Sequence, residues 1–172
     1  DCGGMIACNY YSGEPVTGLE EGRPMFLRRP DSHLGLANFM RSHLYASLAT
    51  LKIGLDILLK EEDVKIDSIT GHGGLFKTKG VGQSILAAAM NAPISVMETA
   101  GEGGAWGMAL LAAYMLSKKD GQSLGDYLDS RVFAERKSET MEPDLADVAG
   151  FETYTKQYQA CLAAEKAAVQ AF

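Results

Sequence analysis

The residues best placed to bind a charged ligand lie in Ile66–Gly74, which reads Ile-Asp-Ser-Ile-Thr-Gly-His-Gly-Gly. A short β-branched segment ends there in a glycine-rich turn, and an apolar helix pattern follows. Glycine lets backbone N–H groups approach a ligand closely, and the N-terminus of the following helix favours negative charge. This arrangement suits a nucleotide phosphate, with Gly73 and Gly74 as the first candidates. The alternative is that a tight turn needs glycine for steric reasons alone.

Two other residues have the chemistry of a general acid and base. Glu14 lies in a turn-rich segment and His43 lies on a predicted helix, and side chains of these types transfer protons in many enzymes. A single glutamate in a turn and a histidine on a long helix also have many structural uses. We therefore predict no catalytic role for either. A thiol role for Cys2, Cys8 or Cys161 has no supporting neighbour in the sequence.

The segments that must position the glycine turn alternate between strand and helix patterns. Apolar residues at helical spacing predict a long helix over Gly35–Lys60, with Asp31 or Ser32 as its N-cap. The other expected elements are strands at Gly4–Asn9, Met25–Leu27, Ile66–Thr70 and Ile94–Met97 and helices at Val81–Met90 and Ala105–Lys118. This order predicts a layered α/β domain.

The remaining segment, Ser123–Phe172, is mostly polar and is predicted to be helical. Six residues are expected to share one side of its final helix: Phe151, Tyr154, Tyr158, Cys161, Leu162 and Glu165. We expect one domain over residues 1–172, with a core over 1–122 and a helical tail over 123–172.

Composition excludes several classes of protein. The chain has 172 residues, of which 47% are hydrophobic and 22% charged, which suits a domain with a buried core. A net charge of −6 gives no support for nucleic-acid binding. Three cysteines without paired spacing favour a reducing cytoplasm over a disulfide framework or zinc site. The longest apolar segment, Ala105–Leu116, is shorter than the roughly 20 residues that span a bilayer.

The order of several motifs resembles the C-terminal half of the FGGY carbohydrate kinases, the family of xylulokinase, ribulokinase and glycerol kinase. The matching segments are Thr70–Gly74, Gln83–Ala87, Asn91–Val96 and Gly104–Ala113, with Tyr10–Pro15 and Arg41–Tyr45 upstream. The resemblance covers about residues 2–118. Three departures from the family pattern are His72 in place of a third glycine, Lys79 where Asn or Ser is frequent, and Trp106 in place of leucine.

The resemblance implies a ribonuclease-H-like domain of the actin, hexokinase and Hsp70 superfamily, with a mixed sheet flanked by helices. Family members transfer the γ-phosphoryl group of ATP, bound with Mg²⁺, to a sugar hydroxyl in a cleft between two lobes. Phosphoryl transfer depends mainly on positioning and charge stabilisation, which two closing lobes can supply. The N-terminal lobe, which carries the catalytic aspartate and most sugar contacts, has no counterpart in this sequence. We therefore expect a kinase domain separated from its partner lobe, with no catalytic residue of its own.

The same resemblance assigns candidate nucleotide-binding residues. Gly73 and Gly74 match the glycines that pass close to the ATP phosphates and ribose, and Leu75 contacts the ribose or packs internally. Lys79 reaches a phosphate or points into solvent. Gly103 and Gly104 leave room for a flat base, or serve only a flexible connection. Trp106 is predicted to lie in the core, as are Met90, Met97, Met108 and Met115.

Three functions stay open at this point. The first is the nucleotide-binding lobe of a pentulose kinase of the xylulokinase kind, and the second is a ribulokinase or glycerol-kinase type. The third is a non-catalytic module that binds a nucleotide or a partner protein. Exposed apolar surface that would normally face the first lobe also makes a homodimer plausible.

Overall fold

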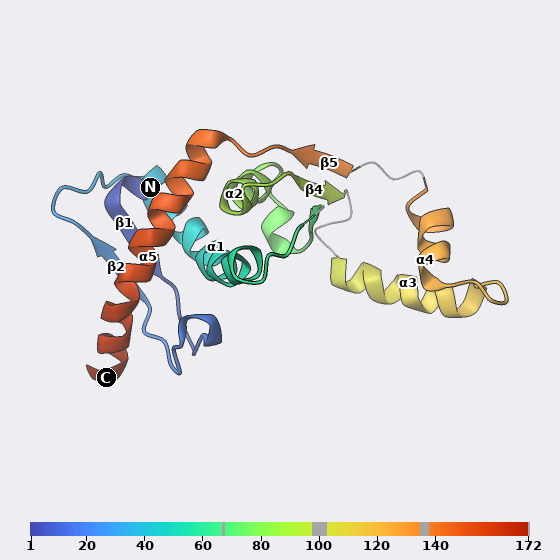
Figure 1. The fold of residues 1–172 in the computed structure, drawn as a ribbon, viewed down its shortest axis with the longest axis horizontal. Helices are drawn as coiled ribbons and strands as arrows, with labels where there is room; N and C mark the ends of the chain where they lie inside the picture. The colour runs from blue at the N-terminus through green and yellow to red at the C-terminus, as the bar shows by residue number, and fades with distance from the viewer. Residues whose placement is uncertain (67, 98–102, 135–137, 172) are drawn as a thin grey trace. The chain divides into compact units, whose positions relative to one another are not determined.

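The computed structural model describes residues 1–66, 68–97, 103–134 and 138–171 of the chain (Figure 1). These residues form two compact units. The first contains Asp1–Asp67, Ile85–Ala92 and Pro143–Phe172, and the second contains Ser68–Ser84 and Pro93–Glu142. The predicted boundary at residue 122 lies inside the second unit. The two units are described separately below.

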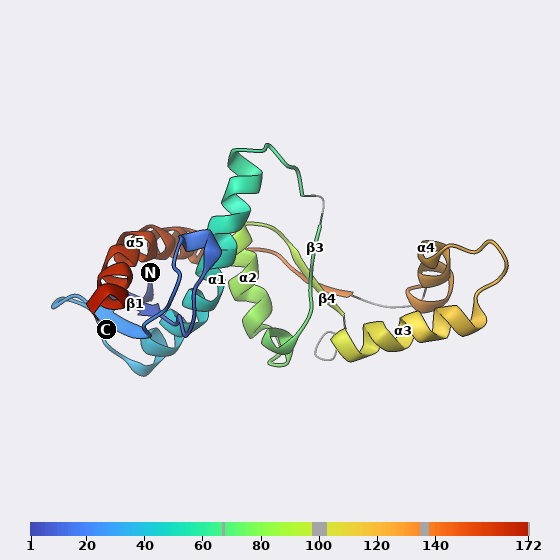
Figure 2. The ribbon, with the colours of Figure 1, turned by 90° about the horizontal axis from the view of Figure 1, so that it is seen from below.

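The first unit is built on a two-stranded antiparallel sheet. Strand β1 (Met5–Cys8) pairs with β2 (Met25–Arg28), with Met5 opposite Arg28 and Cys8 opposite Met25. All four residues of β1 are buried, because the helices α1 (Leu36–Lys60) and α5 (Leu145–Ala171) both pack against this strand. In Figure 2, α5 lies beside β1. These elements confirm the strands and the long helix predicted from the sequence.

The predicted inner side of α5 is confirmed. Phe151, Tyr154 and Tyr158 are each at most 1% exposed. The Tyr154 hydroxyl donates to the backbone oxygen of Ser42 at 3.0 Å, which satisfies the polar end of a buried ring. Helix α5 therefore contributes large aromatic side chains to the core of the first unit.

A buried carboxylate also attaches α5 to the loop before β2. Glu165 is 0% exposed, and its Oε1 accepts the backbone N–H of Arg23 at 2.5 Å. Its Oε2 has no hydrogen-bond partner within the described ranges. Burial of a charged group is costly unless it is bonded, so the Arg23 N–H is an important contact for this region.

The start of α1 corrects one prediction. Gly35 is the N-cap, and it makes no side-chain cap bond. Asp31 instead pairs with Arg29 at 3.3 Å, and Ser32 donates its backbone N–H to the oxygen of Arg29. Both expected caps lie in the turn before the helix, so the helix begins several residues later than its polar signals indicated.

The second unit contains a mixed three-stranded sheet of order β3-β4-β5. Strands β3 (Ile69–Gly71) and β4 (Ile94–Met97) run parallel (Figure 2), with Gly71 opposite Val96. Strand β5 (Ser138–Met141) pairs antiparallel with β4. The α/β class and the mixed sheet are confirmed. Strand β5 lies in a segment predicted to be mostly helical. It is an edge strand whose residues are mostly polar and exposed, so its sequence has no apolar strand pattern.

Helix α2 (Val81–Met90) has the predicted bounds; residues 81–84 of it belong to the second unit and the residues from Ile85 on belong to the first. In the second unit, helix α3 (Gly103–Ser117) starts two residues earlier than predicted. The rest of the unit includes α4 (Leu124–Tyr127), capped by Ser123, and a π-helical segment, η5 (Leu128–Val132). In the described part of the chain, no helix combines the length and apolar character needed to cross a membrane.

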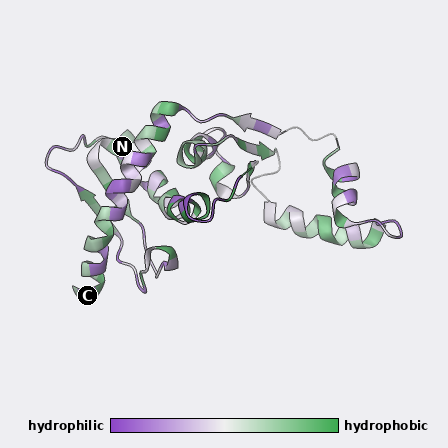
Figure 3. Ribbon diagram, in the orientation of Figure 1, coloured by the Kyte–Doolittle hydropathy of each residue, from purple (hydrophilic) through white to green (hydrophobic). Residues whose placement is uncertain are grey.

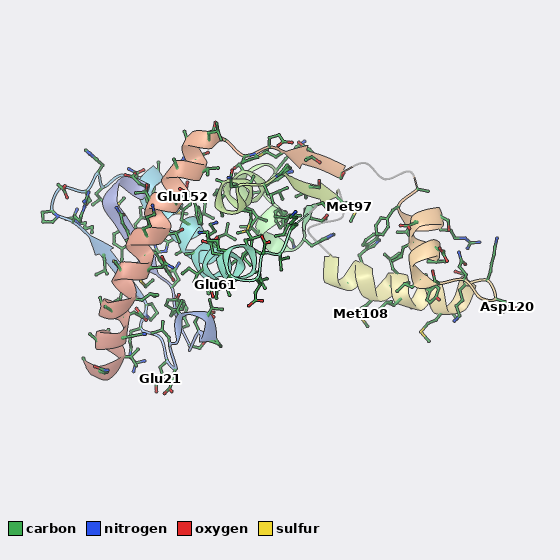
Figure 4. The ribbon with its side chains drawn as sticks, in the orientation of Figure 1. Glu21, Glu61, Met97, Met108, Asp120 and Glu152 are labelled. Carbon is green, nitrogen blue, oxygen red and sulfur yellow. The ribbon has the colours of Figure 1, made fainter. Side chains whose placement is uncertain are left out.

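The predicted burial of α3 is wrong for two methionines. Met108 is 69% exposed and Met115 is 77% exposed, whereas Met90 is buried as predicted. Figure 3 shows how apolar α3 is, and Figure 4 shows Met108 projecting from it. The helix is apolar around its whole circumference, so its composition could not indicate which side is covered. Trp106 is half-buried, and its ring lies 5.9 Å from that of Phe133.

The three cysteines give a direct test of the first unit. Burial raises the pKa of Cys2 to about 11 and that of Cys8 to about 12, and it raises the pKa of the half-buried Cys161 as well. Because the thiolate is the reactive form, we expect maleimide at neutral pH to modify Cys161 first. Peptide mass spectrometry should find one modified thiol in the folded chain and three in denaturant. Rapid modification of Cys8 under native conditions would contradict this packing.

Candidate functional site

The glycine turn after β3 is open on the side that a ligand would approach. Gly73 has φ 106° and ψ −173°, a conformation that residues with a side chain rarely adopt. A Cβ atom at Gly73 or at Gly74 would meet no other atom within 4 Å. The short 3₁₀ helix η3 (Gly74–Phe76) begins here, and the N–H groups of Gly74 and Leu75 have no hydrogen-bond partner in the described ranges. These two N–H groups can therefore donate to an anion.

Two neighbouring glycines have a different, steric role. A Cβ at Gly71 would lie 2.3 Å from the ring of Phe76, and one at Gly82 would lie 2.4 Å from the backbone oxygen of Leu75. The turn is thus folded closely against the end of β3 and the start of α2. Steric need explains Gly71 and Gly82, but it does not explain Gly74, which has open space and an ordinary backbone conformation.

The second glycine-rich connection meets the first. A Cβ at Gly103 would lie 3.2 Å from Nδ1 of His72, so the start of α3 lies against the turn, while Gly104 faces open space. Residues 98–102 of the predicted connection lie outside the described residues. Both connections follow the carboxyl ends of the parallel strands β3 and β4, which is where ligands bind in open α/β sheets.

A cavity of about 510 Å³ opens within the same unit, next to η3 and the start of α2. Apolar atoms of Phe76, Val96 and Met97 form part of its wall; Figure 4 labels Met97 at the end of β4. The other lining residues are polar or small: Thr78, Lys79, Gly80, Gln83, Ser138 and Glu139. A volume of this size is within the usual range for small-molecule sites.

Gln83 is the most buried polar residue of this cavity, at 5% exposure. Its Nε2 donates to the backbone oxygens of Ile94 and Glu139, at 2.7 and 2.8 Å. The side chain therefore joins α2 to β4 and β5. Sequence reasoning quoted Gln83 only as part of a helix motif and did not predict it in the site, because its partners lie 11 and 56 residues further along the chain.

Of the six predicted site residues, Lys79 is the one that lines the cavity. Its Nζ lies 3.1 Å from a carboxylate oxygen of Glu139, with the two side chains 83% and 59% exposed. Exposed pairs of this kind contribute little to stability. Gly73, Gly74 and Leu75 form the turn beside the cavity. Gly103 and Gly104 lie at the start of α3. Five of the predicted residues therefore belong to the two glycine-rich connections, and one belongs to the cavity wall.

Glu14 and His43 have structural contacts in the first unit. Glu14 accepts the N–H of Val16 at 3.0 Å as the cap of the 3₁₀ helix η2 (Pro15–Thr17). The His43 ring stacks on Phe26, and its Nδ1 lies 3.2 Å from Oδ1 of Asn9. Within the ranges that the structure covers, no group of three or more His, Cys, Asp or Glu residues could hold a metal ion.

Residues 1–116 match the family model described as the FGGY family of carbohydrate kinases, C-terminal domain. The chain belongs to this family. The resemblance inferred from the motifs is thereby confirmed, and the matched range includes β1, β2, both glycine connections and most of α3. A search among curated proteins finds no match.

The FGGY assignment agrees with the fold of several solved structures. Gluconate kinase from Lactobacillus acidophilus superimposes with a TM-score of 0.69 at 19% identity, over 95% of this chain and 31% of that one. Xylulose kinase from Rhodospirillum rubrum gives 0.62 at 19%, again over 95% and 31%. Glycerol kinase from Plasmodium falciparum, solved with ADP, gives 0.65 at 18%, over 96% and 31%. At these identities the likeness shows the fold alone, and the chain spans less than a third of each FGGY neighbour.

Proposed function

We propose that this chain is the nucleotide-binding C-terminal lobe of an ATP-dependent sugar kinase that phosphorylates a pentulose such as xylulose. The observation that carries the proposal is the open turn at Gly73 and Gly74. Its N–H donors on Gly74 and Leu75, which have no partner among the described residues, follow the carboxyl end of the first of two parallel strands. Family membership supports a kinase, and one neighbour of the same fold was solved with ADP. The neighbours include gluconate and glycerol kinases, so the sugar could also be of those kinds.

The proposed roles follow the geometry of the second unit. The N–H groups of Gly74 and Leu75 donate to phosphate oxygens, and Gly73 supplies the backbone conformation that points them outward. Gly103 and Gly104 leave space beside the turn, and the nucleoside occupies the adjoining cavity. Lys79, at the cavity mouth, is within the region that a phosphate or ribose would reach. Mg²⁺ would arrive on the ATP phosphates.

Catalysis in this proposal needs a second lobe. We propose a ribonuclease-H-like domain that closes on an N-terminal lobe carrying the catalytic aspartate and most sugar contacts, in the cytoplasm. The described part of this chain supplies donors for a nucleotide but no metal-binding group of three or more acidic, His or Cys residues. The alternative is a non-catalytic nucleotide-binding module of the same family.

Replacing Gly74 with valine tests the phosphate site. The new side chain would enter open space, so the fold should tolerate it, but it would block the approach of a phosphate to the N–H groups. Hydrogen bonds to charged groups are worth about 1.5–3 kcal/mol, so we expect ATP affinity to fall roughly 10- to 100-fold. Isothermal titration calorimetry of the chain, and of the longer enzyme that contains it, measures this change.

The matched control is Gly35→Val, which makes the same replacement at another open glycine in the first unit. It should leave ATP affinity unchanged. Circular dichroism should show both variants folded. If Gly74→Val and Gly35→Val bind ATP equally well, the turn is not part of the nucleotide site.

A further inference from the structure

We propose that the side-chain oxygen of Gln83 accepts a hydrogen bond from the 6-amino group of the bound purine, and that this contact selects adenine over 6-oxo purines. The inference rests on the proposed nucleotide function and adds a specificity-determining residue to it. It concerns the part of the cavity wall that Gln83 forms with Phe76, Val96 and Met97.

The hydrogen bonds of Gln83 fix the direction of its amide. Nε2 has two N–H groups, and both are used by the backbone oxygens of Ile94 and Glu139. A carbonyl oxygen in the place of Nε2 would face two other carbonyl oxygens, so the amide cannot be flipped. Its Oε1 has no partner in the described part of the chain. The residue as a whole is 5% exposed, but Oε1 is not one of the fully buried atoms without a partner, so a donor of a ligand in the cavity can reach it. A ligand that displaces solvent from this oxygen without donating to it loses a hydrogen bond.

The surroundings of Gln83 favour a base over a sugar at this end of the cavity. Phe76, Val96 and Met97 offer an aromatic ring, a branched chain and a thioether, which suit the faces of a flat heterocycle. The exposed polar residues Thr78, Lys79 and Glu139 lie toward solvent and suit hydroxyl groups. Phe76 ends η3, the helix that begins at Gly74, so a base near Gln83 places its phosphates toward the turn.

Ligand variants test this contact without changing the protein. Purine riboside triphosphate lacks the 6-amino group but keeps the ring, ribose and phosphates of ATP. Leaving the Gln83 oxygen unpaired should weaken binding roughly tenfold, and ITP and GTP, which bring an oxygen to the same place, should bind more weakly still. Competition against a fluorescent ATP analogue measures all four affinities, with 2′-deoxy-ATP as the ribose control. We expect 2′-deoxy-ATP to bind within about threefold of ATP.

A protein variant separates Gln83 from other acceptors. In Gln83→Met, which has a similar length and no amide, the ratio of the ATP and purine riboside triphosphate affinities should fall to about one, even if both affinities drop. Equal binding of ATP and purine riboside triphosphate by the unmodified chain would overturn the Gln83 contact and leave the nucleotide site standing. A large loss of affinity for 2′-deoxy-ATP, with no loss for purine riboside triphosphate, would also overturn the Gln83 contact. Absence of ATP binding altogether would instead reject the proposed function.

Discussion

Replacing Gly82 with alanine is expected to destabilise the second unit by about 3 kcal/mol, at the upper end of the range for overpacking a well-packed site. The added Cβ would lie 2.4 Å from the backbone oxygen of Leu75 and 3.0 Å from its carbonyl carbon. Backbone atoms cannot move aside as a flexible side chain can, so either α2 or the turn must shift. Urea unfolding followed by circular dichroism measures the loss.

Gly107→Ala is the matched control for this effect. Gly107 also lies inside a helix, but a Cβ there would meet no atom within 4 Å. Alanine in place of glycine in a helix interior is worth about 0.5–1 kcal/mol, so this variant should be slightly more stable than the parent chain. The two substitutions are expected to have effects of opposite sign. A gain in Gly82→Ala would contradict the packing of Leu75 on α2, and a large loss in Gly107→Ala would contradict the open space at Gly107.

The Gly82 variant should also change ligand binding. Leu75 carries one of the two N–H groups of the turn that have no partner among the described residues, and a backbone shift at its carbonyl is expected to move the adjoining peptide unit that holds this donor. We expect ATP affinity to fall in Gly82→Ala even under conditions where the protein is folded. An unaltered affinity in the folded variant would mean that the turn and the packing of α2 are independent.

The second large effect is that the 172-residue chain by itself is expected not to transfer a phosphoryl group to a sugar. We expect no measurable phosphorylation of xylulose, gluconate or glycerol, because the proposed function gives this chain the nucleotide donors and assigns the reacting groups to a second lobe. The chain spans 31% of each solved neighbour, which is consistent with a divided site. A coupled assay for ADP release, with each sugar in turn, measures the activity.

Binding and turnover must be measured on the same sample for this result to be informative. ATP binding by calorimetry, without turnover, is the expected combination and separates a folded half-site from an unfolded chain. Sugar-dependent ADP release by these residues alone would contradict the division of the site. The Gly74→Val variant, which should lose ATP affinity, then serves as the background control for any residual activity.

The sequence predicted the secondary structure of the FGGY domain well where apolar spacing was regular. Strands β1, β2 and β4 and helices α1 and α2 agree with prediction within about one residue. In α1 the apolar residues recur at helical spacing, and β4 shows in its apolar composition. The start of the long helix was predicted within one residue, but its N-cap was assigned wrongly, because Asp31 and Ser32 are polar turn residues that lie before the helix and Gly35 caps it. Strand β5 was missed because its residues, Ser138–Met141, are mostly polar and exposed.

The sequence by itself determined the family, the α/β class and the glycine turn, since these depend on local residue types and their order along the chain. Only the tertiary structure decided that Gly71 and Gly82 are steric while Gly74 is open, because that difference depends on Phe76 and Leu75 folding back over the turn. It also decided the role of Gln83, whose two acceptors come from β4 and β5. A hydrogen bond between residues 56 positions apart leaves no local pattern in the sequence. The spacing of residues therefore could not predict that Gln83 bonds to β4 and β5.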